Sequence, residues 1–105
     1  MKVEWKDQAI EQLNMVSQYC YEQYGENKMN DFLETLELQD KRLSANPQMG
    51  HPESLLINRS EGFRALSVQK YYKLIYYVDE VKEVIYIVDL WDTRREPQKL
   101  TKRIK

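Results

Sequence analysis

The sequence predicts a single α+β domain over residues 1–105, in which an N-terminal helical hairpin packs on a small antiparallel β-sheet. A length of 105 residues is enough for one modest core and too short for two. Apolar residues follow a helical period over about residues 7–45, whereas β-branched and aromatic residues dominate about residues 63–91. No repeat, low-complexity tract or linker divides the chain.

The first half of the chain has the spacing of two amphipathic helices. One apolar stripe runs through Ala9, Leu13, Val16, Cys20 and Tyr24, and the next runs through Met29, Phe32, Leu36 and Leu43. Asp7 is a suitable N-cap, Gly25 can adopt the left-handed conformation that ends the first helix, and Asn46-Pro47 closes the second. Because the connection at Gly25 is short, we expect the two helices to run antiparallel.

A loop marked by Pro47, Gly50 and Pro52 separates the helices from three expected strands. The strands lie at about Phe63–Val68, Tyr71–Asp79 and Val84–Trp91. The last strand begins Val84-Ile85-Tyr86-Ile87-Val88 and is apolar on both faces, as strands covered on both sides are. One face can pack on the helices. Either a partner or the C-terminal tail folding back must cover the other face.

The composition excludes several classes of protein. Hydrophobic residues form 42% of the chain and charged residues 31%, a balance that is too apolar for a disordered tail. With one cysteine, Cys20, and one histidine, His51, the chain has neither a disulfide framework nor a zinc cluster, so we expect no metal and no cofactor. The sequence has no membrane-length apolar run and no signal-peptide core, so we expect a cytoplasmic protein without a membrane partner.

Basic residues gather at the C-terminal end of an otherwise acidic chain. Residues 1–50 carry 5 basic and 9 acidic side chains, whereas residues 51–105 carry 11 and 8. The tail over residues 94–105 holds Arg94, Arg95, Lys99, Lys102, Arg103 and Lys105. Its only acidic residue is Glu96. Such a tail either contacts an acidic partner or a phosphate backbone, or it only keeps the terminus soluble.

Several local patterns, in their order and spacing, are shared with a known family. They are the run from Trp5 through Ala9 and Leu13 to Tyr24-Gly25, the Pro47-Gln48-Met49-Gly50 loop, Phe63-Arg64-Ala65-Leu66-Ser67-Val68, Tyr72-Lys73-Leu74-Ile75-Tyr76-Tyr77-Val78-Asp79, and Leu90-Trp91-Asp92-Thr93-Arg94-Arg95-Glu96-Pro97. Over roughly residues 3–100 the chain therefore resembles the RelE/ParE superfamily of toxins from bacterial type II toxin–antitoxin systems. The resemblance implies growth inhibition, as in plasmid stabilisation. It also implies a cognate antitoxin that inserts an element against the toxin's sheet or groove.

The resemblance leaves three functions open for this chain. ParE-like members bind and poison DNA gyrase, whereas RelE-like members are endoribonucleases that cut messenger RNA on the ribosome. A third hypothesis is that the chain is a non-toxic relative that only binds the antitoxin. We expect the ParE-like activity, with the ribosome-dependent nuclease as the alternative.

For the nuclease, the resemblance implies catalytic roles for Arg64, Lys73 and Arg94. Strand parity allows Arg64 and Lys73 to point to the same face of the sheet. However, Leu66 replaces a further basic residue of the family pattern, and no tyrosine or histidine follows Trp91 to transfer protons. The missing acid–base group, and a net charge of only -1, favour the activity that works by binding.

The same residues also have structural interpretations. Arg64 can pair with a nearby carboxylate, and Asp92 can orient Arg94 through a charge-assisted hydrogen bond. The strand tyrosines either pack in the sheet or stack on bases: Tyr71, Tyr72, Tyr76, Tyr77 and Tyr86. The residues expected to bind the target or the antitoxin are Arg94, Arg95, Lys99, Lys102 and Arg103.

Overall fold

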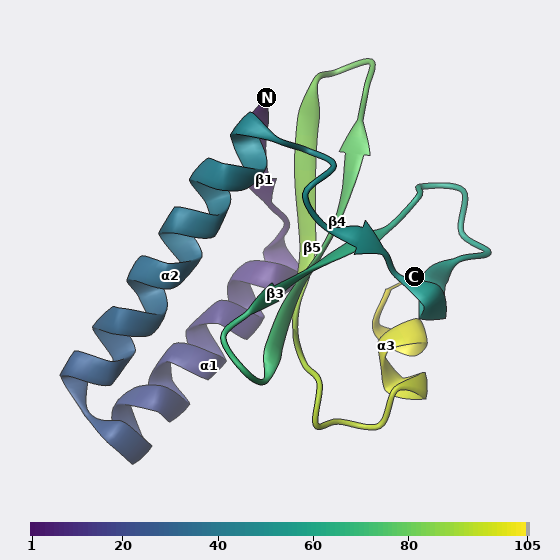
Figure 1. Ribbon diagram of the computed structural model, residues 1–105. Helices are drawn as coiled ribbons and strands as arrows, with labels where there is room; N and C mark the ends of the chain where they lie inside the picture. The colour runs from purple at the N-terminus through teal and green to yellow at the C-terminus, as the bar shows by residue number, and fades with distance from the viewer. Residues whose placement is uncertain (105) are drawn as a thin grey trace.

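A computed structural model describes residues 1–104, and Lys105, the last residue of the expected basic tail, lies outside the described residues. The elements are β1 (Lys2–Trp5), α1 (Asp7–Tyr24), α2 (Glu26–Ala45), β2 (His51–Pro52), the 3-10 turn η1 (Ser54–Leu56), β3 (Arg64–Val68), β4 (Tyr72–Asp79), β5 (Val84–Asp92) and α3 (Gln98–Arg103). The helices α1 and α2 lie on one side of the sheet and α3 on the other (Figure 1). The α+β class and the three long strands are therefore confirmed.

The sheet has the strand order β1-β5-β4-β3-β2. β3 to β5 form an antiparallel ladder, as predicted, and β2 pairs antiparallel with β3. β1 pairs in parallel with β5, with Lys2 opposite Val84 and Trp5 opposite Ile87, so the sheet as a whole is mixed. The sequence analysis assigned no element to this opening segment or to the two-residue β2.

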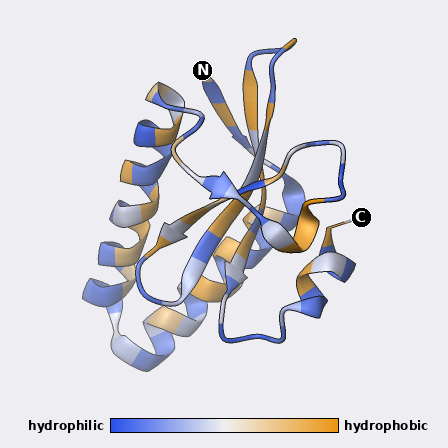
Figure 2. Ribbon diagram, turned by 45° about the vertical axis from the view of Figure 1, so that its right-hand side comes forward, coloured by the Kyte–Doolittle hydropathy of each residue, from blue (hydrophilic) through white to orange (hydrophobic). Residues whose placement is uncertain are grey.

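The helical hairpin is confirmed, and Gly25 joins its two helices with a positive φ of 88°. The apolar stripes of both helices pack against the strands, with Ala9, Phe32, Leu36 and Leu43 buried among Leu66, Leu74, Ile85 and Ile87. Figure 2 shows hydrophobic stretches along the central strands, while the outer side of α2 is mostly hydrophilic. None of the helices described is both long and apolar enough to cross a membrane.

The second face of the sheet is covered by the chain's own C-terminal segment. Leu100 and Ile104 are buried against the sheet, in a cluster that includes Leu56 of η1 and Trp91 of β5. Of the two covers that the sequence left open, the folded-back tail is therefore the one observed. The segment that was expected to be a basic tail contains α3 over Gln98–Arg103.

Polar contacts hold α3 in this position. Arg103 forms an ion pair with Asp89, which is fully buried in β5. Arg59 donates hydrogen bonds to the carbonyl oxygens of Thr101 and Ile104, at 2.9 and 2.5 Å. These carbonyls lie at the C-terminal end of the helix, where intrahelical partners are lacking. Arg103, expected to bind a partner, thus makes an internal contact.

The loop that follows α2 is fixed to the sheet by the phenol of Tyr76. Its Oη accepts the N–H of Gly50 and donates to the carbonyl of Pro47, both at 2.9 Å. A β-carbon at Gly50 would lie 2.5 Å from the carbonyl oxygen of Ala65 and 2.7 Å from Tyr76 Oη. Only glycine fits this close approach of the loop to the sheet.

Candidate functional site: an aromatic groove beside Arg94

An open groove of about 420 Å³ lies between the two long helices and the β3–β4 turn. We call it the aromatic groove, and its principal lining residues are Tyr19, Tyr24, Phe32, Tyr71, Tyr72 and Arg94. A neighbouring hollow shares Val16, Tyr19, Tyr72 and Arg94 with it, so the depression continues along α1 towards the end of β5. Tyr24 is 64% exposed, which is unusual for a large aromatic side chain and typical of binding surfaces.

Arg94 is held in one orientation at the rim of the aromatic groove. Its Nε and Nη2 donate to the two carboxylate oxygens of Asp92, at 3.0 and 2.9 Å, and its backbone N–H donates to Asp92 Oδ1 at 2.9 Å. The guanidinium carbon lies 4.4 Å from the centroid of the Tyr71 ring, a cation–π distance. Asp92 therefore orients Arg94, as one interpretation of the sequence expected.

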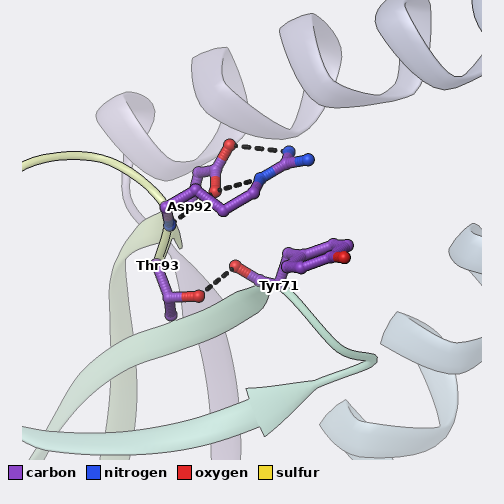
Figure 3. Close-up of polar contacts among 4 residues, drawn as sticks. Tyr71, Asp92 and Thr93 are labelled. Atoms are coloured by element: carbon purple, nitrogen blue, oxygen red, sulfur yellow. Dashed lines mark hydrogen bonds and ion pairs between the residues drawn. The ribbon is translucent and has the colours of Figure 1, made fainter.

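The turn that carries this pair is fixed to the start of β4. Both the backbone N–H and the hydroxyl of Thr93 donate to the carbonyl oxygen of Tyr71, at 2.7 and 2.9 Å (Figure 3). Figure 3 also shows the Asp92 carboxylate and the Tyr71 ring on the same side of the strand ends. The sequence Asp92-Thr93-Arg94 thus supplies an orienting carboxylate, a backbone clamp and an oriented cation in three consecutive residues.

Hydrogen bonding and burial shift the pKa values of three side chains at the aromatic groove. The hydrogen bond from Arg94 holds the pKa of Asp92 below its usual value, and the same bond raises the pKa of Arg94. Burial, followed by the nearby charge of Asp92, raises the pKa of Tyr72 above its usual value. The phenol of Tyr72 is therefore neutral near pH 7 and is unsuited to act as a general base there.

The guanidinium of Arg94 retains hydrogen-bonding capacity. A guanidinium has five N–H groups, and two of those on Arg94 bond to Asp92. The remaining three have no acceptor among the described residues. They can form a fork of the kind that binds carboxylate or phosphate groups. The site thus combines an apolar floor with one oriented cation.

Arg64 and Lys73 do not lie beside Arg94. Arg64 lies opposite Tyr76, far along the ladder from the end where Tyr72 pairs with Asp92. Its Nε and Nη2 donate to the carbonyl oxygen of Gly50, at 3.0 and 2.5 Å. Arg64 therefore fastens the same loop that Tyr76 holds.

Lys73 lies on the other face of the sheet from Arg64. Lys73 pairs with Ser67, which alternates away from the face that carries Arg64 and Leu66. Its ammonium forms an ion pair with Glu53, whose side chain is buried. The expectation that Arg64 and Lys73 share a face is therefore wrong, and the three proposed catalytic cations do not form one site.

The other expected site residues fall into separate environments. Arg95 stacks on Trp91, with its guanidinium carbon 4.9 Å from the ring centroid. Lys99 and Lys102 are exposed on α3, and His51 is exposed on β2. Of the strand tyrosines, Tyr71 and Tyr72 line the aromatic groove and Tyr76 is buried. Tyr77 and Tyr86 stack on each other on the opposite face, with centroids 5.3 Å apart.

Three aromatic residues of the groove were not identified from the sequence. Tyr24 and Phe32 were assigned to the apolar stripes of the helices, and Tyr19 was given no role. The signal for a surface role was the local density of tyrosine near the end of α1, where Tyr19, Tyr21 and Tyr24 are all exposed. The packing of a core needs no such excess of amphipathic rings.

Comparison with known proteins is consistent with this geometry. A family model described as the ParE toxin of the type II toxin–antitoxin system parDE matches residues 3–97. Among solved structures, the chain is similar to one described as the chromosomal ParDE TA system from P. aeruginosa, with 20% sequence identity and a TM-score of 0.69. That similarity covers 88% of this chain and 95% of the other, and it shows a shared fold. No curated protein sequence gives a significant match. Because the family model spans almost the whole sequence, the chain belongs to the ParE toxin family of type II toxin–antitoxin systems.

Proposed function

We propose that this toxin inhibits growth by binding DNA gyrase and that a cognate antitoxin neutralises it by occupying the aromatic groove. Membership of the ParE family supports the class of activity. The observation that carries the choice of binding over RNA cleavage is the separation of the strand cations. Arg64 and Lys73 lie on opposite faces of the sheet, and each makes an internal contact.

A ribonuclease that uses the 2′-hydroxyl needs a base, an acid and cations around one phosphate. Within the described residues, the groove offers Arg94 as its oriented cation and a neutral Tyr72, and His51 lies away from it on β2. Stabilisation of charge by Arg94 alone supplies no proton transfer. The arrangement therefore favours recognition of a partner over chemistry on RNA.

The groove has the chemistry of a peptide-binding surface. Its floor of aromatic rings offers apolar contact area, and the oriented fork of Arg94 offers a site for a carboxylate. We infer that the antitoxin segment carries large apolar residues with an aspartate or glutamate beside them. Preorganisation by Asp92 and Tyr71 lowers the entropy cost of that ion pair.

Two assays with the purified toxin test the proposed activity. The first measures supercoiling of relaxed plasmid by DNA gyrase. The second adds the toxin to ribosomes programmed with a defined message and maps the RNA ends by primer extension. We expect the toxin to inhibit supercoiling and leave the message intact, and we expect a stoichiometric amount of antitoxin to restore supercoiling.

New RNA ends inside the A-site codon, with gyrase unaffected, would overturn the proposal in favour of the ribosome-dependent nuclease. A toxin that binds its antitoxin but changes neither assay would overturn it in favour of a non-toxic relative. For the groove, the antitoxin would be tested against Arg94→Ala and against Arg42→Ala, an exposed arginine on α2 outside the groove. Equal affinity for the two variants would contradict the proposed position of the antitoxin.

A further inference from the structure

A strip of cations lies at the end of the sheet where the β3–β4 turn and the β5–α3 loop come together (Figure 1). We call it the basic strip, and it consists of Lys70, Arg94, Arg95, Lys99 and Lys102, all of them exposed. Lys70 and Arg94 lie over the same ring, that of Tyr71, at 5.3 and 4.4 Å from its centroid. The Tyr71 ring therefore brings a cation of the β3–β4 turn beside a cation of the β5–α3 loop.

The part of the strip on α3 is held rigidly. Leu100 and Ile104 face the sheet, and the ion pair of Arg103 fixes the helix to β5. Lys99 and Lys102 are left on the side that faces solvent, and neither makes an ion pair within residues 1–104. Lys99 and Lys102 are three residues apart within α3, so their side chains lie on the same side of that helix.

The surroundings of Arg95, Lys99 and Lys102 do not have the features of a protein-binding surface. Stable protein interfaces rely on buried aromatic or aliphatic anchors near their centre. The exposed residues between Arg95 and Lys99 are Glu96, Pro97 and Gln98, none of which offers a large apolar side chain. Contacts to nucleic acid phosphates need no such anchor, because cations alone supply most of the binding free energy.

The Tyr71 ring belongs to the aromatic groove, and the ring beside Arg95 is not free to stack on unpaired bases. Arg94 and Lys70 lie over the Tyr71 ring, and Arg95 lies over Trp91, which is only 2% exposed. Proteins that bind single strands use open aromatic faces as stacking platforms. Arg95, Lys99 and Lys102 have no such platform, and cations of this kind suit a duplex, whose bases are already stacked and whose phosphates face outwards.

We propose that the basic strip binds the phosphate backbone of duplex DNA. The contact is independent of base sequence, because the strip has no groove-reading element and lysine acts on phosphate as a point charge. It does not depend on which enzyme the toxin inhibits. A strip that contacts four or five phosphates should bind DNA weakly by itself, so we expect this contact to add to another one.

The test measures fluorescence anisotropy of a short labelled duplex of mixed sequence with the full-length toxin over a range of potassium chloride concentrations. For the wild type we expect a slope of log affinity against log salt of about -4. The variant Lys99→Gln/Lys102→Gln should have a shallower slope of about -2. The matched control is Lys41→Gln/Lys82→Gln, which removes two exposed lysines from α2 and the β4–β5 turn, and its slope should equal that of the wild type.

Competition identifies the class of ligand. Unlabelled duplex should displace the probe at a lower charge concentration than single-stranded DNA or poly-L-glutamate. Stronger displacement by poly-L-glutamate would overturn the proposal in favour of an acidic protein, and stronger displacement by the single strand would overturn the preference for duplex. Equal slopes for the two double variants would also overturn it, as would no binding at the lowest salt. Circular dichroism of both variants checks that their fold is retained.

Discussion

The guanidinium of Arg103 in α3 donates two hydrogen bonds to the carboxylate of Asp89 in β5, with N–O distances of 2.8 and 3.0 Å. Asp89 is fully buried, and its Oδ1 also accepts the N–H of Leu90 at 3.0 Å. The hydrogen bonds to Asp89 raise the pKa of Arg103 above its usual value. The cations near the C-terminus therefore divide into one that fastens α3 to the sheet and others that remain available to partners.

Arg103→Ala should lower the free energy of unfolding by about 3–5 kcal/mol, because it leaves the charge of Asp89 buried without its partner. Urea denaturation measures this change. Lys102→Ala, on the exposed side of the same helix, should change stability by less than about 0.5 kcal/mol. In an Asp89→Ala background, Arg103→Ala should cost much less. An equal cost in both backgrounds would show that the ion pair is not the source of the loss.

Tyr76→Phe should lower the free energy of unfolding by about 1–3 kcal/mol, since the buried N–H of Gly50 and the carbonyl of Pro47 both lose their partner. Tyr21→Phe removes a hydroxyl from an exposed ring and serves as the control. Thermal or urea unfolding of the two variants compares them directly. If both variants were equally stable, the phenol would not be what holds the loop against the sheet.

Arg94→Ala should weaken antitoxin binding by about tenfold or more, the loss expected for a charge-assisted hydrogen bond of 1.5–3 kcal/mol. Stability should change little, because Arg94 is exposed. Arg94→Lys should restore only part of the affinity, since an ammonium cannot form the same planar fork. Isothermal titration calorimetry gives the affinities. Full rescue by lysine would indicate that net charge matters and orientation does not.

The stability of the protein should depend on the titration of Asp40. Trp5 Nε1 donates to Asp40 Oδ2 at 3.0 Å, but burial of this carboxyl is the larger effect and raises its pKa above 3.8. Because the folded-state pKa is the higher one, ionised Asp40 disfavours folding at neutral pH. That cost disappears as the pH falls through the raised pKa.

We therefore expect the stability of the wild type, relative to Asp40→Asn, to increase as the pH is lowered from 7 towards 3.8. Urea unfolding at several pH values measures the difference. Glu34→Gln, an exposed change on the same helix, controls for the altered net charge. A stability difference that is flat or moves in the opposite direction would show that Asp40 is not desolvated in the folded protein.

The helical hairpin and three strands are predictable because their signals are local and long. Gly25 separates two helical stripes, and most residues of β4 and β5 are β-branched or aromatic. β1 has only four residues, and its parallel pairing with β5 is a distant tertiary contact. α3 has six residues, and what positions it is the contact of Arg103 with Asp89, which no local pattern contains.

Arg64 and Lys73 were expected on one face of the sheet, and they lie on opposite faces because of the length of the β3–β4 turn. Val68 pairs with Tyr72, so the β3–β4 turn has three residues, Gln69, Lys70 and Tyr71. With a turn of that length, residues of even number in β3 and β4 share one face and residues of odd number share the other. A turn of two or four residues would have placed both cations together. Sequence alone indicated the strands but not this length.

The groove was only partly foreseen. Arg94 and its orientation by Asp92 were identified from the sequence, because Asp92 at the end of β5 and Arg94 in the following turn carry opposite charges two residues apart. The aromatic residues contributed by α1 and α2 were not, since a helical period assigns every apolar residue on the stripe to the core. The far end of that stripe extends beyond the sheet, and Tyr24 is therefore exposed.

The parallel pairing of Lys2 with Val84 also fixes when the toxin can exist in its native form. During translation the first strand leaves the ribosome long before the strand that it needs, and α1 and α2 emerge without the sheet that buries their apolar stripe. The native fold therefore assembles only after nearly the whole chain has been synthesised, because β5, which lies between β1 and β4, is made last among the strands. Because Arg94 follows β5 in the chain, the aromatic groove is also complete only at the end of synthesis.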